Sequence, residues 1–228
     1  MNTLKIKNRI SKLIKQKDKF YFVDSILQNG KLFDIGCGNN SPYRIKTLRP
    51  DIYYVGIDIE IDSQSLSSNK YADEFILTDA SNFYAEIAKY PNTFDSVISS
   101  HNLEHCNDYQ NVTLAMINSL KLGGTIYISF PCEESAKFPS RKGTLNFYDD
   151  DTHRNLINYK TFISLLNQNG MDILFATKRN RPFIPFILGF LFEPFSRLLN
   201  KQVPLGATWA FFGFETIIIA KKREANMY

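Results

Sequence analysis

The sequence predicts an α/β fold in which a mainly parallel sheet is covered by helices. Two observations predict it. Short apolar segments recur along the chain, each followed by an acidic, polar or glycine residue, and stretches with helical periodicity separate them. The 228 residues are 44% hydrophobic, which is enough to bury one sizeable core. We therefore expect residues 1–228 to form a single domain.

The first predicted strand is residues 31–35 (KLFDI), and a glycine turn, residues 36–38 (GCG), follows it directly. Glycine lacks a Cβ, so its backbone can turn tightly and approach a ligand closely. A helix is expected after this turn, with Ser41 as its N-cap and Pro42 at its first position.

The second predicted strand, residues 53–57 (YYVGI), ends at Asp58. The order of strand, glycine turn, helix, strand and acid is typical of folds that bind a cofactor containing adenosine. A carboxylate at the tip of this strand can accept hydrogen bonds from both hydroxyl groups of a ribose.

Asp34 indicates which cofactor this turn accommodates. A dinucleotide-binding turn has the pattern G-x-G-x-x-G, and Ser41 stands here at its last position. A carboxylate at Asp34, just before the turn, would repel a pyrophosphate and attract an ammonium group. S-adenosyl-L-methionine (SAM) carries an ammonium and a sulfonium group and no phosphate, so SAM is favoured over NAD. The alternative is that Asp34 only caps the following turn.

The rest of the chain continues the alternation of strands and helices. The expected elements are strands at 75–78, 94–99, 125–130, 171–176 and 214–220, and helices at 111–120 (stopped by Gly123-Gly124) and 159–169. Because ligands bind at the carboxyl ends of parallel strands, Asp34, Asp58 and Asp79 are expected to lie along one ligand-binding edge.

Two segments have no place in a minimal sheet of this kind. Residues 132–158 form a long insertion without clear periodicity, and such loops usually carry function. Residues 181–213 contain an intensely apolar stretch, 182–195, which is shorter than the about 20 residues needed to span a bilayer. We expect a lid over the substrate pocket. An interface in a homodimer or a peripheral membrane contact through 181–213 are the alternatives.

These motifs together resemble a known family. LFDIGCG, VGIDI, ILTDA, FDSVISSHNLEHCND and LKLGGTIYISFP are similar, in order and spacing, to the motifs of class I SAM-dependent methyltransferases of the type 11/12 kind, in the small-molecule or surface-glycan branch. The resemblance covers about residues 31–131. The family's third glycine is Asn40 here, a residue that tolerates a left-handed backbone.

The resemblance implies a Rossmann-like, doubly wound, seven-stranded sheet with its last strand antiparallel and helices on both faces. It divides the domain into a basic helical arm (1–30), a SAM-binding core (31–131) and substrate or lid insertions (132–158 and 178–213).

The resemblance also implies SAM as cofactor, with S-adenosyl-L-homocysteine as product. In this assignment Asp34 lies near the methionine ammonium, Asp58 holds the ribose, and Asp79 accepts from the adenine amino group beside Ala80. Ile59 packs on adenine, and the backbone of Ser99–His101 closes the methionine end. The implied cofactor-binding residues are Asp34, Gly36, Cys37, Gly38, Asp58, Ile59, Asp79, Ala80, Ser99, Ser100 and His101.

The candidate catalytic residues are His105, Glu104 and His153. Methyl transfer to an alcohol needs a base, and His105 follows the fourth strand, where the methyl group should point. The alternatives are that His105 is a structural residue starting the next helix, that Glu104 is simply solvated, and that His153 is a surface loop residue.

Residues 101–105 also spell H-x-x-E-H, a zinc-protease pattern, but its position directly after a strand argues against that reading. Some methyltransferases of quinone biosynthesis use this segment to hold Mg²⁺, yet a histidine at position 101 suits Mg²⁺ poorly, so no metal is expected.

Composition restricts the partners and the compartment. A net charge of +4 without a separate basic domain does not favour nucleic acid, which argues against an RNA methyltransferase. The odd set of Cys37, Cys106 and Cys132 indicates reduced thiols that serve as small packing residues, and with no signal peptide the expected location is cytoplasmic.

The expected function is methyl transfer from SAM to a small molecule, a sugar or phosphorylated precursor in surface polysaccharide (capsule or lipopolysaccharide) biosynthesis. The alternatives are an RNA methyltransferase, a cofactor-binding protein of this fold that has lost catalysis, and an NAD-dependent enzyme.

Overall fold

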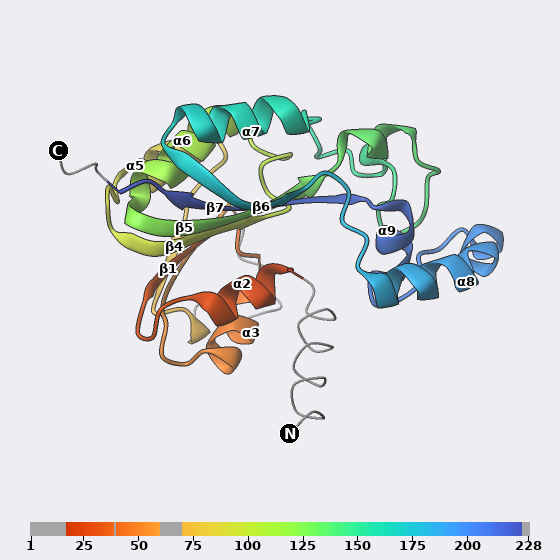
Figure 1. The fold of residues 1–228 in the computed structure, drawn as a ribbon, viewed down its shortest axis with the longest axis horizontal. Helices are drawn as coiled ribbons and strands as arrows, with labels where there is room; N and C mark the ends of the chain where they lie inside the picture. The colour runs from red at the N-terminus through yellow and green to blue at the C-terminus, as the bar shows by residue number, and fades with distance from the viewer. Residues whose placement is uncertain (1–16, 39, 60–69, 225–228) are drawn as a thin grey trace, which may run out of the picture.

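The computed structural model describes residues 17–38, 40–59 and 70–224, and its centre is a seven-stranded sheet with the order β3-β2-β1-β4-β5-β7-β6 (Figure 1). The strands are β1 (Lys31–Ile35), β2 (Tyr53–Asp58), β3 (Glu74–Leu77), β4 (Phe94–Ser100), β5 (Leu120–Pro131), β6 (Met171–Thr177) and β7 (Glu215–Lys222). The pairs β1–β2, β1–β4, β2–β3 and β4–β5 are parallel, and β7 is antiparallel to both β5 and β6. The predicted fold class is confirmed.

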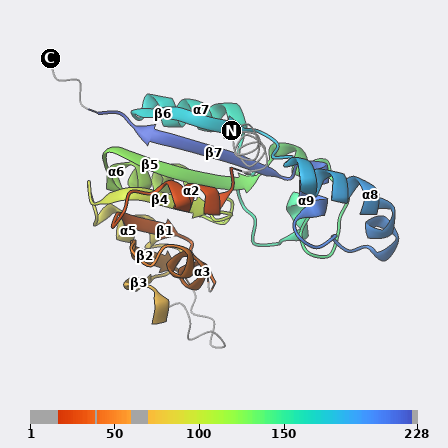
Figure 2. The same cartoon turned by 60° about the horizontal axis from the view of Figure 1, so that its bottom comes forward.

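Helices cover both faces of this sheet (Figures 1 and 2). The elements are α2 (Lys19–Ser25), α3 (Ser41–Leu48), α5 (Phe83–Ala88), α6 (Tyr109–Ser119), α7 (Tyr159–Gln168), α8 (Phe183–Leu199) and α9 (Ala207–Phe212), with short 3-10 turns at Glu133–Lys137 and Phe147–Asp149. Neighbouring residues of a strand point to opposite faces. Leu32 therefore joins the core beneath α2 and α3, and Phe33 joins the core beneath α5, α6 and α7.

The glycine pair Gly123-Gly124 does not stop a helix, and this prediction is wrong. Helix α6 already ends at Ser119, and the chain enters β5 at Leu120. Phe94 pairs with Leu120 and Ser96 pairs with Thr125, so a β-bulge accommodates the residues between these two pairs. The positive φ of Gly123 (75°) serves this bulge.

The start of α3 also differs from the prediction by one residue. The N-cap is Asn40, which makes no capping bond with its side chain, and Pro42 lies in the first turn. Ser41 is the first residue of the helix, and its hydroxyl donates to the carboxylate of Asp34 and accepts from Lys19.

Three further predictions concern the N-terminal arm, the cysteines and the apolar segment of the chain. The part of the basic arm at 1–16 lies outside the described residues, whereas α2 belongs to the described part. Cys37 and Cys132 are buried free thiols, as predicted, and Cys106 is a half-buried one. Among the described helices, none is both long and apolar enough to cross a bilayer.

Candidate functional site

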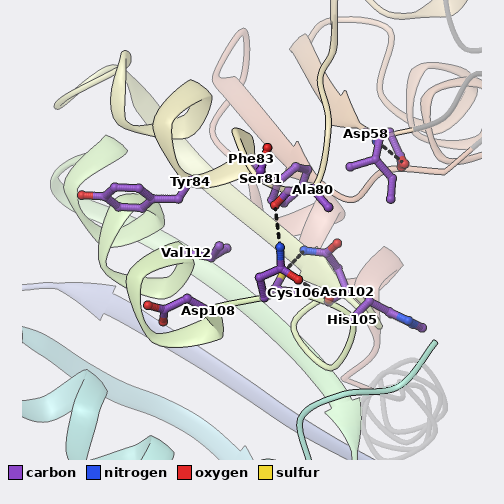
Figure 3. A pocket seen from close by; sticks show the side chains of 12 residues that line it. Asp58, Ala80, Ser81, Phe83, Tyr84, Asn102, His105, Cys106, Asp108 and Val112 are labelled. Atoms are coloured by element: carbon purple, nitrogen blue, oxygen red, sulfur yellow. Dashed lines mark hydrogen bonds between the residues drawn. The ribbon is translucent and has the colours of Figure 1, made fainter. Parts of the chain in front are cut away.

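A cleft with a volume of ≈ 470 Å³ lies at the carboxyl ends of β1, β2 and β4. It is lined by Gly36, Gly38, Asp58, Ile59, Ala80, His101, Asn102, His105, Thr152 and Arg154. A smaller pocket of ≈ 100 Å³ shares Asp58, Asn102 and His105 with it and continues toward Tyr84 and Asp108. Figure 3 shows this pocket between Ala80 and Ser81 on one side and Asn102, His105 and Cys106 on the other.

The glycine turn is joined directly to the acid at the tip of β2. The backbone amide of Gly38 donates to Oδ2 of Asp58 at 2.6 Å, and the amide of Ile59 donates to Oδ1. Both bonds orient the carboxylate beside the cleft, and each of its oxygens keeps acceptor capacity for a further donor. This geometry suits a ligand that presents two neighbouring hydroxyl groups, as a ribose does.

Gly36 is required for steric reasons. Its φ is +69°, and a Cβ built on it would lie 2.3 Å from Oδ1 and 2.7 Å from the Cβ of Asn102. Gly38 has a φ of +58°, but a Cβ there would meet nothing within 4 Å. The absence of a side chain at Gly36 thus allows Asn102, in the segment after β4, to pack against the backbone at the end of β1.

Asp34 does not line the cleft, and its expected role near the methionine ammonium group, through water, stays a prediction. Its side chain is fully buried and accepts hydrogen bonds from Lys19 at 2.9 Å, from Tyr54 at 2.8 Å and from Ser41. The buried charge of this carboxylate is therefore balanced by the ammonium group of Lys19 within the protein itself.

Asp79 is held by the turn that precedes α5. Oδ1 accepts from the amides of Ser81 and Asn82, and Oδ2 accepts from the side-chain amide of Asn82 at 2.8 Å. These bonds, first of all from the Ser81 hydroxyl, lower the pKa of Asp79 to about 2. The neighbours Ala80 and Ser81 line the smaller pocket and Asp79 does not, so its contact with adenine stays a prediction.

His105 and His153 lie together although they are distant in sequence. Their ring centroids are 4.8 Å apart, and the His105 side chain lines both the cleft and the pocket. His105 lies in a turn ahead of α6, so it does not start a helix. The His153 side chain is only 5% exposed and Nδ1 donates to the carbonyl of Phe147, so it is not a surface loop residue.

Hydrogen bonds indicate which ring nitrogen of His105 carries the proton. The hydroxyl of Thr152 donates to Oδ1 of Asp150, so it can only accept from Nδ1 of His105, at 2.9 Å. In the neutral ring Nε2 is then the acceptor. Burial raises the pKa of Asp150, but the hydrogen bonds from Thr152 outweigh it and hold that pKa below its ordinary value. The result is an Asp150–Thr152–His105 chain with a proton acceptor at its end.

His101 forms the centre of a second polar cluster. Its Nδ1 lies 3.2 Å from Oε1 of Glu104, and its Nε2 lies 3.2 Å from Oε1 of Glu215. Burial would lower the pKa of His101, but the bonds to these two carboxylates raise it to about 10. His101 is therefore an imidazolium ion at neutral pH, and it cannot serve as a base. Glu104 is fully buried in this pair, so it is not a solvated side chain.

The insertion is fastened to the segment after β4 by its backbone. The amides of Arg154 and Asn155 both donate to the carbonyl of Glu104, at 2.8 and 3.0 Å. The Asn155 side chain adds a bond of 2.6 Å to the carbonyl of Cys106. This attachment brings Thr152 and Arg154 to the cleft.

Glu104, His105 and His153 could also hold a cation, because one ligand atom of each lies within 4.8 Å of the others. Two imidazoles and a carboxylate suit Zn²⁺ better than Mg²⁺, which prefers oxygen ligands. Oε1 of Glu104 pairs with His101, whereas its buried Oε2 has no hydrogen-bond partner among the described residues. A catalytic role of the three residues stays a prediction.

A further small pocket of ≈ 80 Å³ adjoins the His101 cluster through Trp209 and Glu215. The rings of His101 and Trp209 are 5.1 Å apart. The pocket continues to Asn180 and Pro182, ahead of α8. The segment 181–213 therefore contributes to this pocket, and its role as a lid over the substrate pocket stays a prediction.

The structure brings most of the predicted cofactor residues to the cleft: Gly36, Gly38, Asp58, Ile59, Ala80 and His101 line it, whereas Asp34, Cys37, Asp79, Ser99 and Ser100 do not. Sequence reasoning missed Lys19, Asn102, Thr152 and Arg154. Asn102 lies within the predicted segment after β4 and could have been named from that position. The others are placed by tertiary contacts that no local pattern indicates.

Known proteins resemble this chain in sequence and in fold. The sequence model of a family described as a methyltransferase domain matches residues 6–174. A phosphoethanolamine N-methyltransferase from Triticum aestivum is 29% identical over 171 residues, which are 72% of this chain and 32% of that protein. The chain thus matches about a third of the length of this relative.

Among solved structures, a SAM-dependent methyltransferase from Archaeoglobus fulgidus has a TM-score of 0.59 and 21% identity, over 89% of this chain and 90% of its own. Phosphoethanolamine N-methyltransferase 2 from Haemonchus contortus, in complex with phosphomonomethylethanolamine and S-adenosylhomocysteine, has a TM-score of 0.56 and 16% identity, over 90% and 51%. At these identities the likeness concerns the fold.

Proposed function

Because this chain belongs to the methyltransferase-domain family, we propose that it transfers a methyl group from SAM to a small acceptor molecule and releases S-adenosyl-L-homocysteine. The observation that carries the proposal is the bond between Gly38 and Asp58. It places a carboxylate with free acceptor capacity beside the glycine turn, at the carboxyl ends of β1 and β2.

The cofactor's own chemistry supplies an activated methyl group, because the sulfonium is a good leaving group. The protein must hold the acceptor in line with it and remove a proton from an alcohol or an ammonium group. We assign proton removal to Nε2 of His105, oriented by the Thr152–Asp150 chain. His153 packs against His105 but is only 5% exposed, so we assign it a role through His105 rather than in contact with the acceptor.

The acceptor we propose is a small phosphorylated molecule or a sugar hydroxyl, as in a precursor of a surface polysaccharide. Two observations support a phosphorylated acceptor. Arg154 is an exposed cation on the rim of the cleft, and the relative from T. aestivum is named for phosphoethanolamine. The glycan assignment is supported by the sequence resemblance alone.

Calorimetric titration with SAM and S-adenosyl-L-homocysteine tests the cofactor, with NAD⁺ as the competing ligand. We expect micromolar binding of the first two and loss of binding in Asp58→Ala. Asp172→Ala is the matched control, because this carboxylate is exposed on β6, away from the cleft. Binding of NAD⁺ in place of SAM, or equal affinity of the two variants, would contradict the proposal.

Transfer of a labelled methyl group from SAM then tests the acceptor. Phosphoethanolamine, nucleotide-linked sugars and bulk RNA would be offered in parallel. Methylation of either small-molecule class and loss of transfer in His105→Gln are expected. Labelling of RNA alone would favour the RNA methyltransferase that the modest net charge of +4 argues against.

A further inference from the structure

Helix α8 turns its small and polar residues toward the protein. Gly189, Glu193 and Ser196 lie on one face of the helix, at the spacing of one and two turns. Gly189 and Ser196 are buried, and Glu193 bonds to Arg141 at 3.1 Å. A surface helix of a globular protein has the opposite arrangement, with apolar residues on the protein side.

The outer face of α8 consists of large apolar side chains. The most exposed are Phe183 (76%), Phe190 (60%), Phe195 (62%), Leu198 (82%) and Leu199 (65%). Figures 1 and 2 both show α8 at one end of the molecule, beside α9. A continuous apolar surface of this kind marks an interaction site.

This orientation is fixed by close packing. A Cβ on Gly189 would lie 2.2 Å from the carbonyl oxygen of Ala207 and 2.7 Å from the Cβ of Phe211. Only glycine allows α8 and α9 to approach this closely. The ion pair between Glu193 and Arg141 holds the same face, so the helix cannot bury its phenylalanines by rotating.

Three exposed cations lie near the C-terminal end of this helix. Arg197 and Lys201 are exposed near the end of α8, and Lys142 lies beside Lys201 through a backbone bridge. The only acid within 181–213 is Glu193, which is 18% exposed and paired. The apolar face is therefore bordered by cations whose charge no acid of the segment balances.

We propose that α8 lies in the plane of an anionic lipid surface, with its phenylalanines and leucines in the acyl region and Arg197, Lys201 and Lys142 at the phosphate level. Its 17 residues are too few to span a bilayer, but aromatic, aliphatic and basic residues in this distribution are those of an interfacial helix. A second copy of the chain is a poorer occupant, because a two-fold contact through this face would bring like charges together.

Sedimentation of the full-length protein with lipid vesicles tests this inference. The vesicles are phosphatidylcholine alone, or phosphatidylcholine and phosphatidylglycerol in equal parts. We expect binding to the mixed vesicles that weakens at high salt and is lost in Phe190→Asn/Phe195→Asn. Arg197→Gln/Lys201→Gln should weaken it by about tenfold or more.

The matched controls are Leu27→Asn/Leu122→Asn, which removes exposed leucines elsewhere, and Lys31→Gln/Lys160→Gln, which removes exposed cations elsewhere. Both should bind vesicles like the wild type, and all variants should keep their affinity for S-adenosyl-L-homocysteine, which reports folding. Binding that neither pair of α8 substitutions alters would overturn the proposal. So would a stable dimer that fails to bind vesicles and dissociates on Phe190→Asn/Phe195→Asn.

Discussion

The ammonium group of Lys19 lies 2.9 Å from Oδ2 of Asp34, a carboxylate with no exposed surface. Lys19 belongs to α2 and Asp34 to β1, so the pair fastens the helix to the first strand of the sheet. Tyr54 donates to the same carboxylate from β2. Asp34 is thus a structural anion beneath the glycine turn.

Lys19→Met should destabilise the protein strongly, because it leaves a buried carboxylate without its counter-charge. We expect a loss of about 3 kcal/mol in the free energy of unfolding. Denaturant unfolding measures it, with Lys89→Met as the control. Lys89 pairs with Glu86 on the surface, and breaking that pair should cost about 0.5 kcal/mol or less. Equal losses in the two variants would refute the structural role of Lys19.

Asp58→Asn should weaken cofactor binding, and the new NH2 group cannot accept from one of the amides of Gly38 and Ile59. The substitution keeps the shape of the side chain but removes the charge that strengthens hydrogen bonds from ribose hydroxyls. Each such bond contributes about 1.5–3 kcal/mol, which predicts a loss of affinity of about tenfold to a hundredfold. Titration with S-adenosyl-L-homocysteine measures this, and an unchanged affinity would show that Asp58 does not hold the ribose.

Gly36→Ala and Gly38→Ala should differ although both glycines have positive φ. At Gly38 the added methyl group meets open space, so only backbone strain of about 1–2 kcal/mol is expected. At Gly36 the methyl group also overlaps Asn102, so the loss in unfolding free energy should be clearly larger. Thermal and denaturant unfolding compare the two, and a larger loss for Gly38→Ala would contradict the geometry.

His105→Gln should lower kcat by about 10²–10⁴-fold if His105 removes the proton. Thr152→Val should reduce kcat by about tenfold or more, because the imidazole is then free to adopt the wrong tautomer. The pH–rate profile distinguishes a base from a structural residue. The acid limb should disappear in His105→Gln and persist in Thr152→Val, whereas a purely structural His105 would leave the limb unchanged.

His101 should make stability depend on pH above neutrality. Its pKa rises from 6.5 to about 10 on folding, so the folded protein binds this proton more tightly. The resulting stabilisation is complete below about pH 6.5 and is lost as the pH rises through about 10. His101→Asn removes the titrating group, and asparagine tolerates the left-handed φ of 51°. Denaturant unfolding at several pH values should show a smaller loss of stability for this variant between pH 7 and pH 10.

The strands were predictable because each carries its signal locally. The apolar segment at 31–35 and its glycine turn, and the segment at 53–57 with its terminal acid, lie where they were expected. The Gly123-Gly124 stop failed because a β-bulge and a helix end use the same residue type.

The site was predictable only in part, for a physical reason. Gly36, Gly38 and Asp58 reach the cleft because the carboxyl ends of neighbouring parallel strands lie at one edge of the sheet, independently of the loop conformations. The contact of His105 with His153 depends on backbone bonds from the insertion to Glu104. The outward face of α8 depends on the approach to α9, and periodicity alone cannot tell which face of an apolar helix is packed.

The close approach of Asn102 to Gly36 limits which substitutions this sequence can accept at position 36. Because even the Cβ of Asn102 lies within 2.7 Å of where a Cβ at position 36 would be, alanine at 102 would not relieve the overlap. A descendant that acquires a side chain at 36 must therefore have glycine at 102 or shift the loop after β4, and with it His105. Position 102 can change while glycine stays at 36, but position 36 can gain a side chain only once the residue or the loop at 102 has changed.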